Sequence, residues 1–141
     1  MIIVHDHPPL WDLISAKFPI AGKPVIFAWG YMIFNPEGVV VSRDLHAHEE
    51  IHGMRQLEYM PALGKNKSIE RWWHAYIGSP DFRLAEELPA HIAEYKSMCS
   101  WITDRNTRDQ ALHQVACKLA SPLYGSLVTL QIARKLLMRS K

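Results

Sequence analysis

The sequence has few of the residues that stabilise small secreted domains or cysteine-rich zinc sites. Its 141 residues include only two cysteines, Cys99 and Cys117, and no C-x-x-C pair. This usage favours free thiols in a reducing compartment over a disulfide framework. No stretch approaches the roughly 18 apolar residues of a membrane-spanning helix, and the first residues do not resemble a secretory signal. We therefore expect a cytoplasmic protein with no membrane partner.

The chain also lacks a strong excess of charge of either sign. Its formal net charge is +2, so electrostatics give no reason to expect a nucleic-acid partner. Apolar residues make up 48% of the chain and charged residues 21%, which is typical of one compact domain with a single core. We expect a single domain over residues 1–141. The composition leaves the oligomeric state open.

Short β-rich segments occupy the first third of the sequence. Residues 2–4 favour a short strand, and residues 25–29, 31–34 and 39–41 are rich in β-branched and aromatic side chains, with a turn at 35–38. This pattern predicts a small antiparallel sheet. Ser42 then offers a hydroxyl as N-cap for a helix over residues 43–60.

Helical spacing dominates the remainder. Pro89 fits best in the first turn of a helix, which would place Glu86 and Glu87 at its N-terminus. Thr107 and Gln110 have the spacing of a capping box. The expected helices cover residues 69–77 with Ser68 as cap, 85 or 89 to 102, 107–120 and 122–139. The predicted fold class is α+β and mainly helical, with the small sheet before the helix at 43–60.

The chain contains eight histidines, and two of them form the pattern H-E-x-x-H in the stretch AHEEIHGMRQ. His48 and His52 are four residues apart, so on a helix both imidazoles face the same side and can bind one ion. Glu49 lies about 100° round the helix from His48, within reach of a water on that ion. A carboxylate there can take the proton of the water as it attacks a carbonyl. The pattern predicts a metal-dependent hydrolase with Glu49 as general base.

A catalytic zinc normally has three protein ligands and one open position, so a third ligand is needed. Arg55 and Glu58 occupy the places where a metzincin has its glycine and third histidine, which excludes that solution. A later helix offers candidates in the stretch FRLAEELPAHIAEYK. We prefer Glu87, with Glu86 and then His91 as the alternatives; Glu87, His91 and Glu94 share one helical face.

AHEEIHGMRQ followed by FRLAEELPAHIAEY resembles the small gluzincin-type zinc metallopeptidase domains of phage and prophage proteins. The likeness covers roughly residues 25–100. It implies a minimal zincin-like domain in which His48, His52 and Glu87 hold one catalytic Zn²⁺ and Ala90 completes an E-x-x-A ligand motif. Pro89 departs from the acidic residue that many relatives carry there.

The resemblance also implies roles for further residues. Gln56 matches a glutamine often found one turn after the second histidine, where it supports the ligands or packs. The 29–34 segment would lie along the cleft and pair with a peptide substrate. A group that stabilises the oxyanion is expected as well, and the candidates are Tyr95, His113 and Tyr124.

The leading hypothesis is therefore a zinc-dependent metallopeptidase that acts on a peptide or protein, of phage or prophage origin. One alternative is a regulatory protease that acts on a mobile-element repressor. Another is a catalytically silent structural or interaction protein with a zincin fold, although such a scaffold has no chemical need for Glu49. Two histidines and a carboxylate also suit other divalent ions, so the sequence does not fix the metal.

Overall fold

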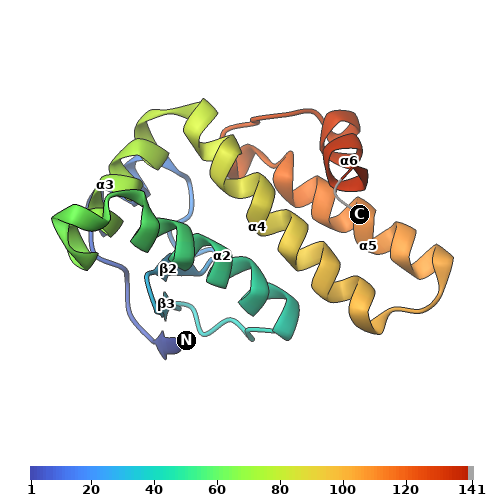
Figure 1. Ribbon diagram of the computed structural model, residues 1–141, viewed down its shortest axis with the longest axis horizontal. Coiled ribbons are helices and arrows are strands. Elements are labelled where there is room, and N and C mark those ends of the chain that lie inside the picture. The colour runs from blue at the N-terminus through green and yellow to red at the C-terminus, as the bar shows by residue number, and fades with distance from the viewer. Residues whose placement is uncertain (140–141) are drawn as a thin grey trace.

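Six α-helices and a three-stranded sheet make up the computed structural model, which describes residues 1–139. The long helix α4 (Pro80–Trp101) lies between α2 (Arg43–Tyr59) and α5 (Arg105–Leu119), as Figure 1 shows. The mainly helical α+β class predicted from the sequence is confirmed. The other helices are α1 (Trp11–Lys17), α3 (Lys65–Gly78) and α6 (Leu130–Met138), with 3₁₀ turns η1 (Pro61–Leu63) and η2 (Pro122–Tyr124).

The sheet is mixed, not antiparallel throughout. Strand β3 (Met32–Phe34) lies in the centre, antiparallel to β2 (Phe27–Trp29) and parallel to β1 (Ile2–Val4). The strand expected at 39–41 is absent from the described structure. The Asn35 side chain bonds both the N–H and the carbonyl of Val39 at 2.8 Å, which holds this segment in a turn. The edge of β3 that it would have paired is taken by β1.

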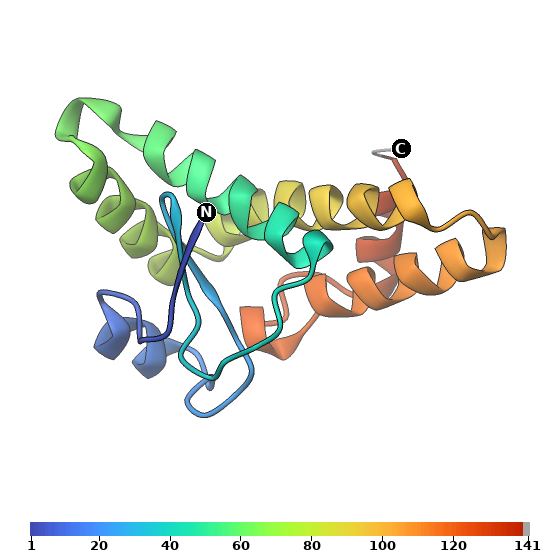
Figure 2. The ribbon, with the colours of Figure 1, turned by 90° about the horizontal axis from the view of Figure 1, so that it is seen from below.

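Helix α2 begins as predicted and packs very closely on the sheet. The Ser42 hydroxyl accepts a hydrogen bond from the N–H of Leu45 at 3.1 Å, which is the expected N-cap. Gly53 faces the β2–β3 turn, where a Cβ on Gly53 would lie 2.0 Å from the carbonyl oxygen of Gly30. Only glycine allows this approach, so Gly53 lets α2 lie close to the turn between β2 and β3 (Figure 2).

Helix α4 begins earlier than the sequence predicted. Pro80 occupies its first turn, and the Ser79 hydroxyl caps it by accepting from the N–H of Phe82. Pro89 lies inside the helix instead of at its start, where its missing N–H leaves the carbonyl of Ala85 without the usual helical donor. The prediction that Glu86 and Glu87 lie at a helix N-terminus was wrong, because both are interior residues of α4.

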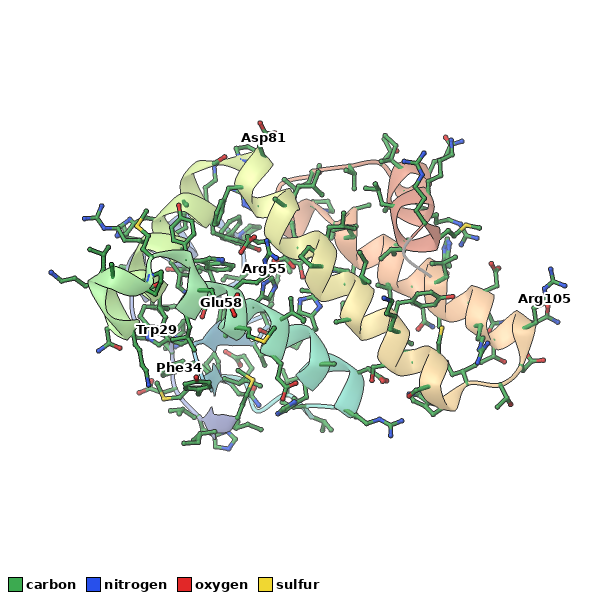
Figure 3. All side chains as sticks on the ribbon, in the orientation of Figure 1. Trp29, Phe34, Arg55, Glu58, Asp81 and Arg105 are labelled. Atoms are coloured by element: carbon green, nitrogen blue, oxygen red, sulfur yellow. The ribbon has the colours of Figure 1, made fainter. Side chains whose placement is uncertain are left out.

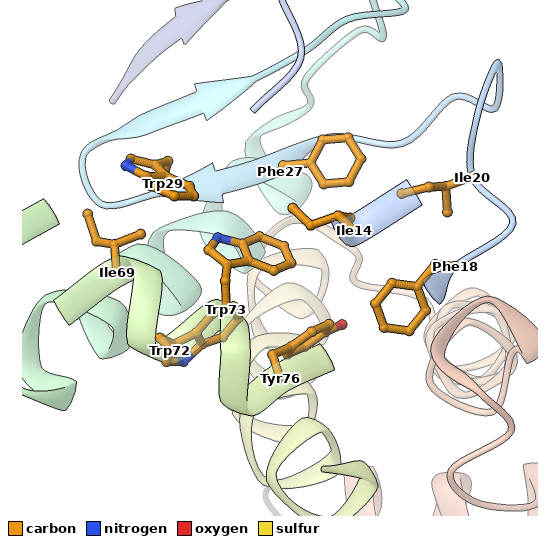
Figure 4. Packing of buried hydrophobic residues seen from close by; sticks show 9 residues of the cluster. All are labelled: Ile14, Phe18, Ile20, Phe27, Trp29, Ile69, Trp72, Trp73 and Tyr76. Carbon is orange, nitrogen blue, oxygen red and sulfur yellow. The ribbon is translucent and has the colours of Figure 1, made fainter. Parts of the chain in front are cut away.

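Two apolar cores lie at the two ends of the molecule. The first joins α1, β2 and α3, and Figure 4 shows Trp73 of α3 facing Phe27 of β2 while Tyr76 points toward Phe18. The second joins α4, α5 and α6, with members Tyr95, Ile102, Ala111, Leu112, Val115, Ala116, Leu119, Ala133 and Leu137. The α2–α4 interface separates the two cores.

Three predicted helix boundaries differ from the structure. Ser68 lies inside α3, where its hydroxyl donates to the carbonyl of Gln56 and accepts from the N–H of Met60. Asp104, not Thr107, caps α5. The helix expected over 122–139 is divided into η2 and α6.

None of the helices within residues 1–139 is both long enough and apolar enough to cross a membrane.

Candidate metal centre

The buried face of α2 is polar. Its buried residues are His48, Glu49, His52, Gly53 and Gln56. Burying charged or hydrogen-bonding side chains costs free energy unless they find partners, so such a face does not form for stability alone. The partners of these residues therefore indicate what the face is for.

The partners come mainly from α4, which runs antiparallel to α2. Residue numbers rise along α2 as they fall along α4: Asp44 accepts from the Ser97 hydroxyl at 2.7 Å, and His48 meets Glu94 at 2.8 Å. His52 then meets Glu87 at 3.2 Å. This register brings the H-E-x-x-H residues against the candidates for the third ligand.

Glu87 lies at the centre of the cluster. Its carboxylate is 3.5 Å from Nε2 of His48 and 3.2 Å from Nε2 of His52, and it accepts a hydrogen bond from the Tyr76 hydroxyl at 2.5 Å. Burial alone would raise the pKa of this carboxyl, but the adjacent His52 and His48 outweigh burial and hold the pKa well below its usual range. Glu87 is therefore a buried carboxylate anion facing both motif histidines.

A second carboxylate orients His48. Nδ1 of His48 lies 2.8 Å from Glu94, and Glu94 in turn accepts from the Lys118 ammonium at 2.6 Å. Burial would lower the pKa of His48, but hydrogen bonds to Glu87 and Glu94 raise it to about 10. Burial would raise the pKa of Glu94, whereas His48 and Lys118 lower it to about 2. Because Glu94 occupies Nδ1, Nε2 is the nitrogen that faces Glu87. Metal-binding histidines usually have such a carboxylate or carbonyl partner on the nitrogen that does not bind the ion.

His91 is fully buried and lies beside His48, with ring centroids 4.6 Å apart. Its Nδ1 is 2.7 Å from the backbone carbonyl of Glu87. A carbonyl can only accept, so Nδ1 carries the proton. Burial lowers the pKa of His91 to about 3, which keeps the ring neutral. Its Nε2 therefore carries a buried lone pair that has no hydrogen-bond partner in the described structure.

His48, Glu87 and His91 form a compact group that can hold a metal ion. One ligand atom of each side chain lies within 4.8 Å of a ligand atom of the other two. Residues 1–139 contain one such group of three or more possible metal-binding side chains. The predicted ligand set was His48, His52 and Glu87, so two members are shared. His52 lies against Glu87 but outside the compact group, and its role as a ligand stays a prediction.

The chemistry of these donors fits a divalent ion. Imidazole nitrogens and one carboxylate suit zinc and its neighbours in the first transition row. Three buried ring nitrogens have no hydrogen-bond partner in the described structure: Nδ1 of His52, Nε1 of Trp73 and Nε2 of His91. Buried polar atoms of this kind are rare without a ligand or water, and an ion bound by His91 would give its Nε2 a partner.

Glu86, the second candidate for the third ligand, faces away from the histidines. Its carboxylate accepts from the Arg55 guanidinium at 2.6 and 2.9 Å and from the indole N–H of Trp72 at 2.5 Å. Figure 3 shows Arg55 reaching from α2 toward α4. Glu86 thus belongs to a structural ion pair one residue away from the cluster.

Glu49 lines a pocket together with His48 and His52. Burial raises the pKa of its carboxyl, and the two imidazoles oppose this rise only in part. Glu87 is the remaining charged side chain of the lining, which is otherwise formed by apolar residues and by Gln56, Trp72, Trp73, Tyr76 and Tyr124. The pocket thus brings a carboxylate of raised basicity to the edge of the histidine cluster.

The three candidates for oxyanion stabilisation occupy very different places. Tyr95 is buried in the second apolar core, and His113 is exposed on α5, so neither lines the pocket. Tyr124 lines the pocket, and burial together with Glu87 and Glu49 raises its pKa well above the usual range. Its hydroxyl therefore stays protonated and can donate.

The expectation that the 29–34 segment pairs with a substrate was wrong for most of its length. β3 is the central strand, and its backbone is paired on both sides by β1 and β2. The free edge that faces α2 belongs to β2. There Gln56 donates to the carbonyl of Ala28 at 2.9 Å and accepts from the N–H of Gly30 at 2.8 Å. Gln56 occupies the edge as a neighbouring strand would.

Sequence reasoning missed two supporting residues and assigned no role to a third. Tyr76 and Lys118 carry no signal in the sequence, because each reaches the cluster from a different helix through tertiary packing. Glu94 was expected on one helical face with Glu87 and His91, but its contact with His48 depends on how α2 and α4 pack.

Comparisons of this chain with protein-family models, with curated proteins and with solved structures found no match.

Proposed function

We propose that the protein is a zinc-dependent hydrolase of amide bonds, most simply a metallopeptidase. The observation that carries the proposal is the pocket where Glu49 lines the wall beside His48 and His52 while Glu87 faces both imidazoles. His48, His52 and Glu87 would hold the ion. When bound, the ion would polarise the substrate carbonyl and acidify water.

In this proposal Glu49 takes a proton from the attacking water. Its burial favours the neutral acid, so its carboxylate is a stronger base than an exposed glutamate. After the attack the same carboxyl can return the proton to the leaving amine. Tyr124 would donate a hydrogen bond from its hydroxyl to the oxygen that becomes negative, since its raised pKa keeps the hydroxyl protonated.

The lining of the pocket suggests the kind of substrate group that enters. Apart from the histidine and glutamate cluster, the lining carries no charged side chain. Its apolar wall includes Ile14, Phe18, Phe27 and Leu123. We therefore propose a substrate with an uncharged, apolar side chain next to the bond that is cut, because a charge would lose its hydration without a partner.

The test compares Glu49→Gln with wild type on quenched fluorescent peptides that carry apolar residues, after loading both proteins with zinc. Glu50→Gln is the matched control, since Glu50 is adjacent and its side chain is 56% exposed. We expect Glu49→Gln to keep its zinc and to lose about 10²- to 10⁴-fold in rate, the usual contribution of a positioned general base. Full activity of Glu49→Gln, or no hydrolysis by zinc-loaded wild type, would contradict the proposal.

A further inference from the structure

We propose that His91 is a ligand of the metal ion, through its Nε2, in addition to the histidines of the H-E-x-x-H pattern. The inference rests on the metal-binding part of the proposed function and is independent of whether the site hydrolyses amides. It adds to the site a donor that the pattern does not contain.

The first argument is the position of the ring nitrogen. One ligand atom of His91 lies within 4.8 Å of ligand atoms of both His48 and Glu87, and all three side chains are buried. His91 Nε2 has no hydrogen-bond partner in the described structure. The ring of His91 thus lies beside two other donors and carries a buried nitrogen that needs a partner.

The second argument is the orientation of the ring. A metal-binding histidine usually gives its other N–H to a carboxylate or a backbone carbonyl, which fixes the tautomer. His48 meets this condition through Glu94, and His91 meets it through the carbonyl of Glu87. Nδ1 of His52, in contrast, is buried without a partner. By this criterion His91 is better prepared to bind an ion than His52 is.

The third argument is the way the helix carries both donors. Glu87 and His91 are four residues apart on α4, as His48 and His52 are on α2, so each helix presents two donors one turn apart. Ala90 is fully buried between the helices, and its small side chain permits the close approach of the two pairs. The ion would therefore be held by two facing pairs of donors.

The chemical consequence is a site with more nitrogen donors than two histidines and one glutamate give. Three imidazoles favour zinc, cobalt, nickel and copper over magnesium, calcium and manganese, which prefer oxygen ligands. With four protein donors, water or substrate can bind only if the ion expands to five-coordinate or if one imidazole moves away.

The experiment measures zinc binding by calorimetry for wild type, His91→Ala and the control His74→Ala, whose side chain is exposed on α3. Loss of a residue that only orients a ligand typically costs 10- to 100-fold in metal affinity. We expect His91→Ala to lose at least about 100-fold, because it removes the ligand itself. His74→Ala should bind zinc as wild type does.

A second measurement needs no mutation at the site. In ¹⁵N spectra of the histidine side chains of wild type, saturating zinc should shift Nε2 of His91, while Nδ1 keeps its proton. An unchanged Nε2 signal at saturating zinc would overturn the inference, even if His91→Ala had lost affinity through misfolding. In that case the proposed function would still stand, whereas wild type that binds no zinc would remove both.

Discussion

The two faces of helix α4 differ in kind, although both are buried. The face toward α5 and α6 packs Leu84, Leu88, Ile92 and Tyr95 into an apolar core. The face toward α2 buries Glu87, His91 and Glu94 against the histidines of the metal motif. The first arrangement gains free energy from removing apolar surface from water. The second arrangement costs free energy, because charged groups lose their hydration and pairing offsets that cost only in part.

Helix α4 thus stabilises the fold through one face and holds the histidine and glutamate cluster on the other. α4 is anchored by its apolar face, so its opposite face can hold groups that would not assemble by themselves. Arg83 contributes to the anchoring at the start of the helix, because its guanidinium bonds the carbonyls of Tyr76, Ile77 and Tyr124. These bonds tie α4 to α3 and to η2, which carries the pocket residue Tyr124. The histidine and glutamate cluster therefore lies among segments that these hydrogen bonds join.

The largest expected effect concerns the apolar face. Leu119→Ala removes a fully buried side chain of the second core and should lower the free energy of unfolding by about 2–5 kcal/mol. Denaturant titration measures the loss, with Leu13→Ala, at a side chain 46% exposed, as the control. Zinc bound per folded chain should not change. A loss of zinc in chains that remain folded would mean that the two faces are not separable.

The next effect concerns the carboxylate behind His48. Glu94→Gln keeps the shape of the side chain but removes the charge that orients His48 and pairs with Lys118. We expect zinc affinity to fall by about 10- to 100-fold, with a smaller change in stability. Calorimetry of zinc binding provides the measurement. Unchanged affinity would show that Glu94 is a structural partner of Lys118 and does not support the site.

The smallest effect separates two neighbouring residues of the same helix. Glu86→Gln weakens the bonds to Arg55, whose side chain is 42% exposed, so we expect a loss of about 1 kcal/mol in the free energy of unfolding. Zinc content should stay at the wild-type level, because Glu86 faces Arg55 and Trp72. If Glu86→Gln lost its zinc, Glu86 would have to replace Glu87 as the proposed ligand.

The sequence predicted the local part of this arrangement well. Ser42 as cap and the helix from Arg43 follow from hydrogen-bonding and spacing rules that act over a few residues. The position of His48 and His52 on one face is of the same kind. The preference for Glu87 over Glu86 also rested on helical spacing, and in the structure Glu87 is the one that faces the histidines.

Tertiary context decided the rest. Pro89 is tolerated inside α4 because packing on two sides holds the helix, and no local rule anticipates that. The parallel pairing of β1 with β3 joins segments about thirty residues apart, which the pattern of residues does not specify. The sequence offered His91 only as the third choice of ligand, and its position beside His48 depends on how α2 and α4 pack together.

Metal content of the purified protein tests the central claim most directly. Wild type, His48→Ala and Glu87→Gln would be analysed after exposure to zinc and removal of free metal, with Glu50→Gln as a control on an exposed carboxylate. We predict about one zinc per chain in wild type and in Glu50→Gln, as expected for a single site, and loss of zinc in the other two variants. Wild type that holds no zinc, or variants that hold as much as wild type, would contradict the account.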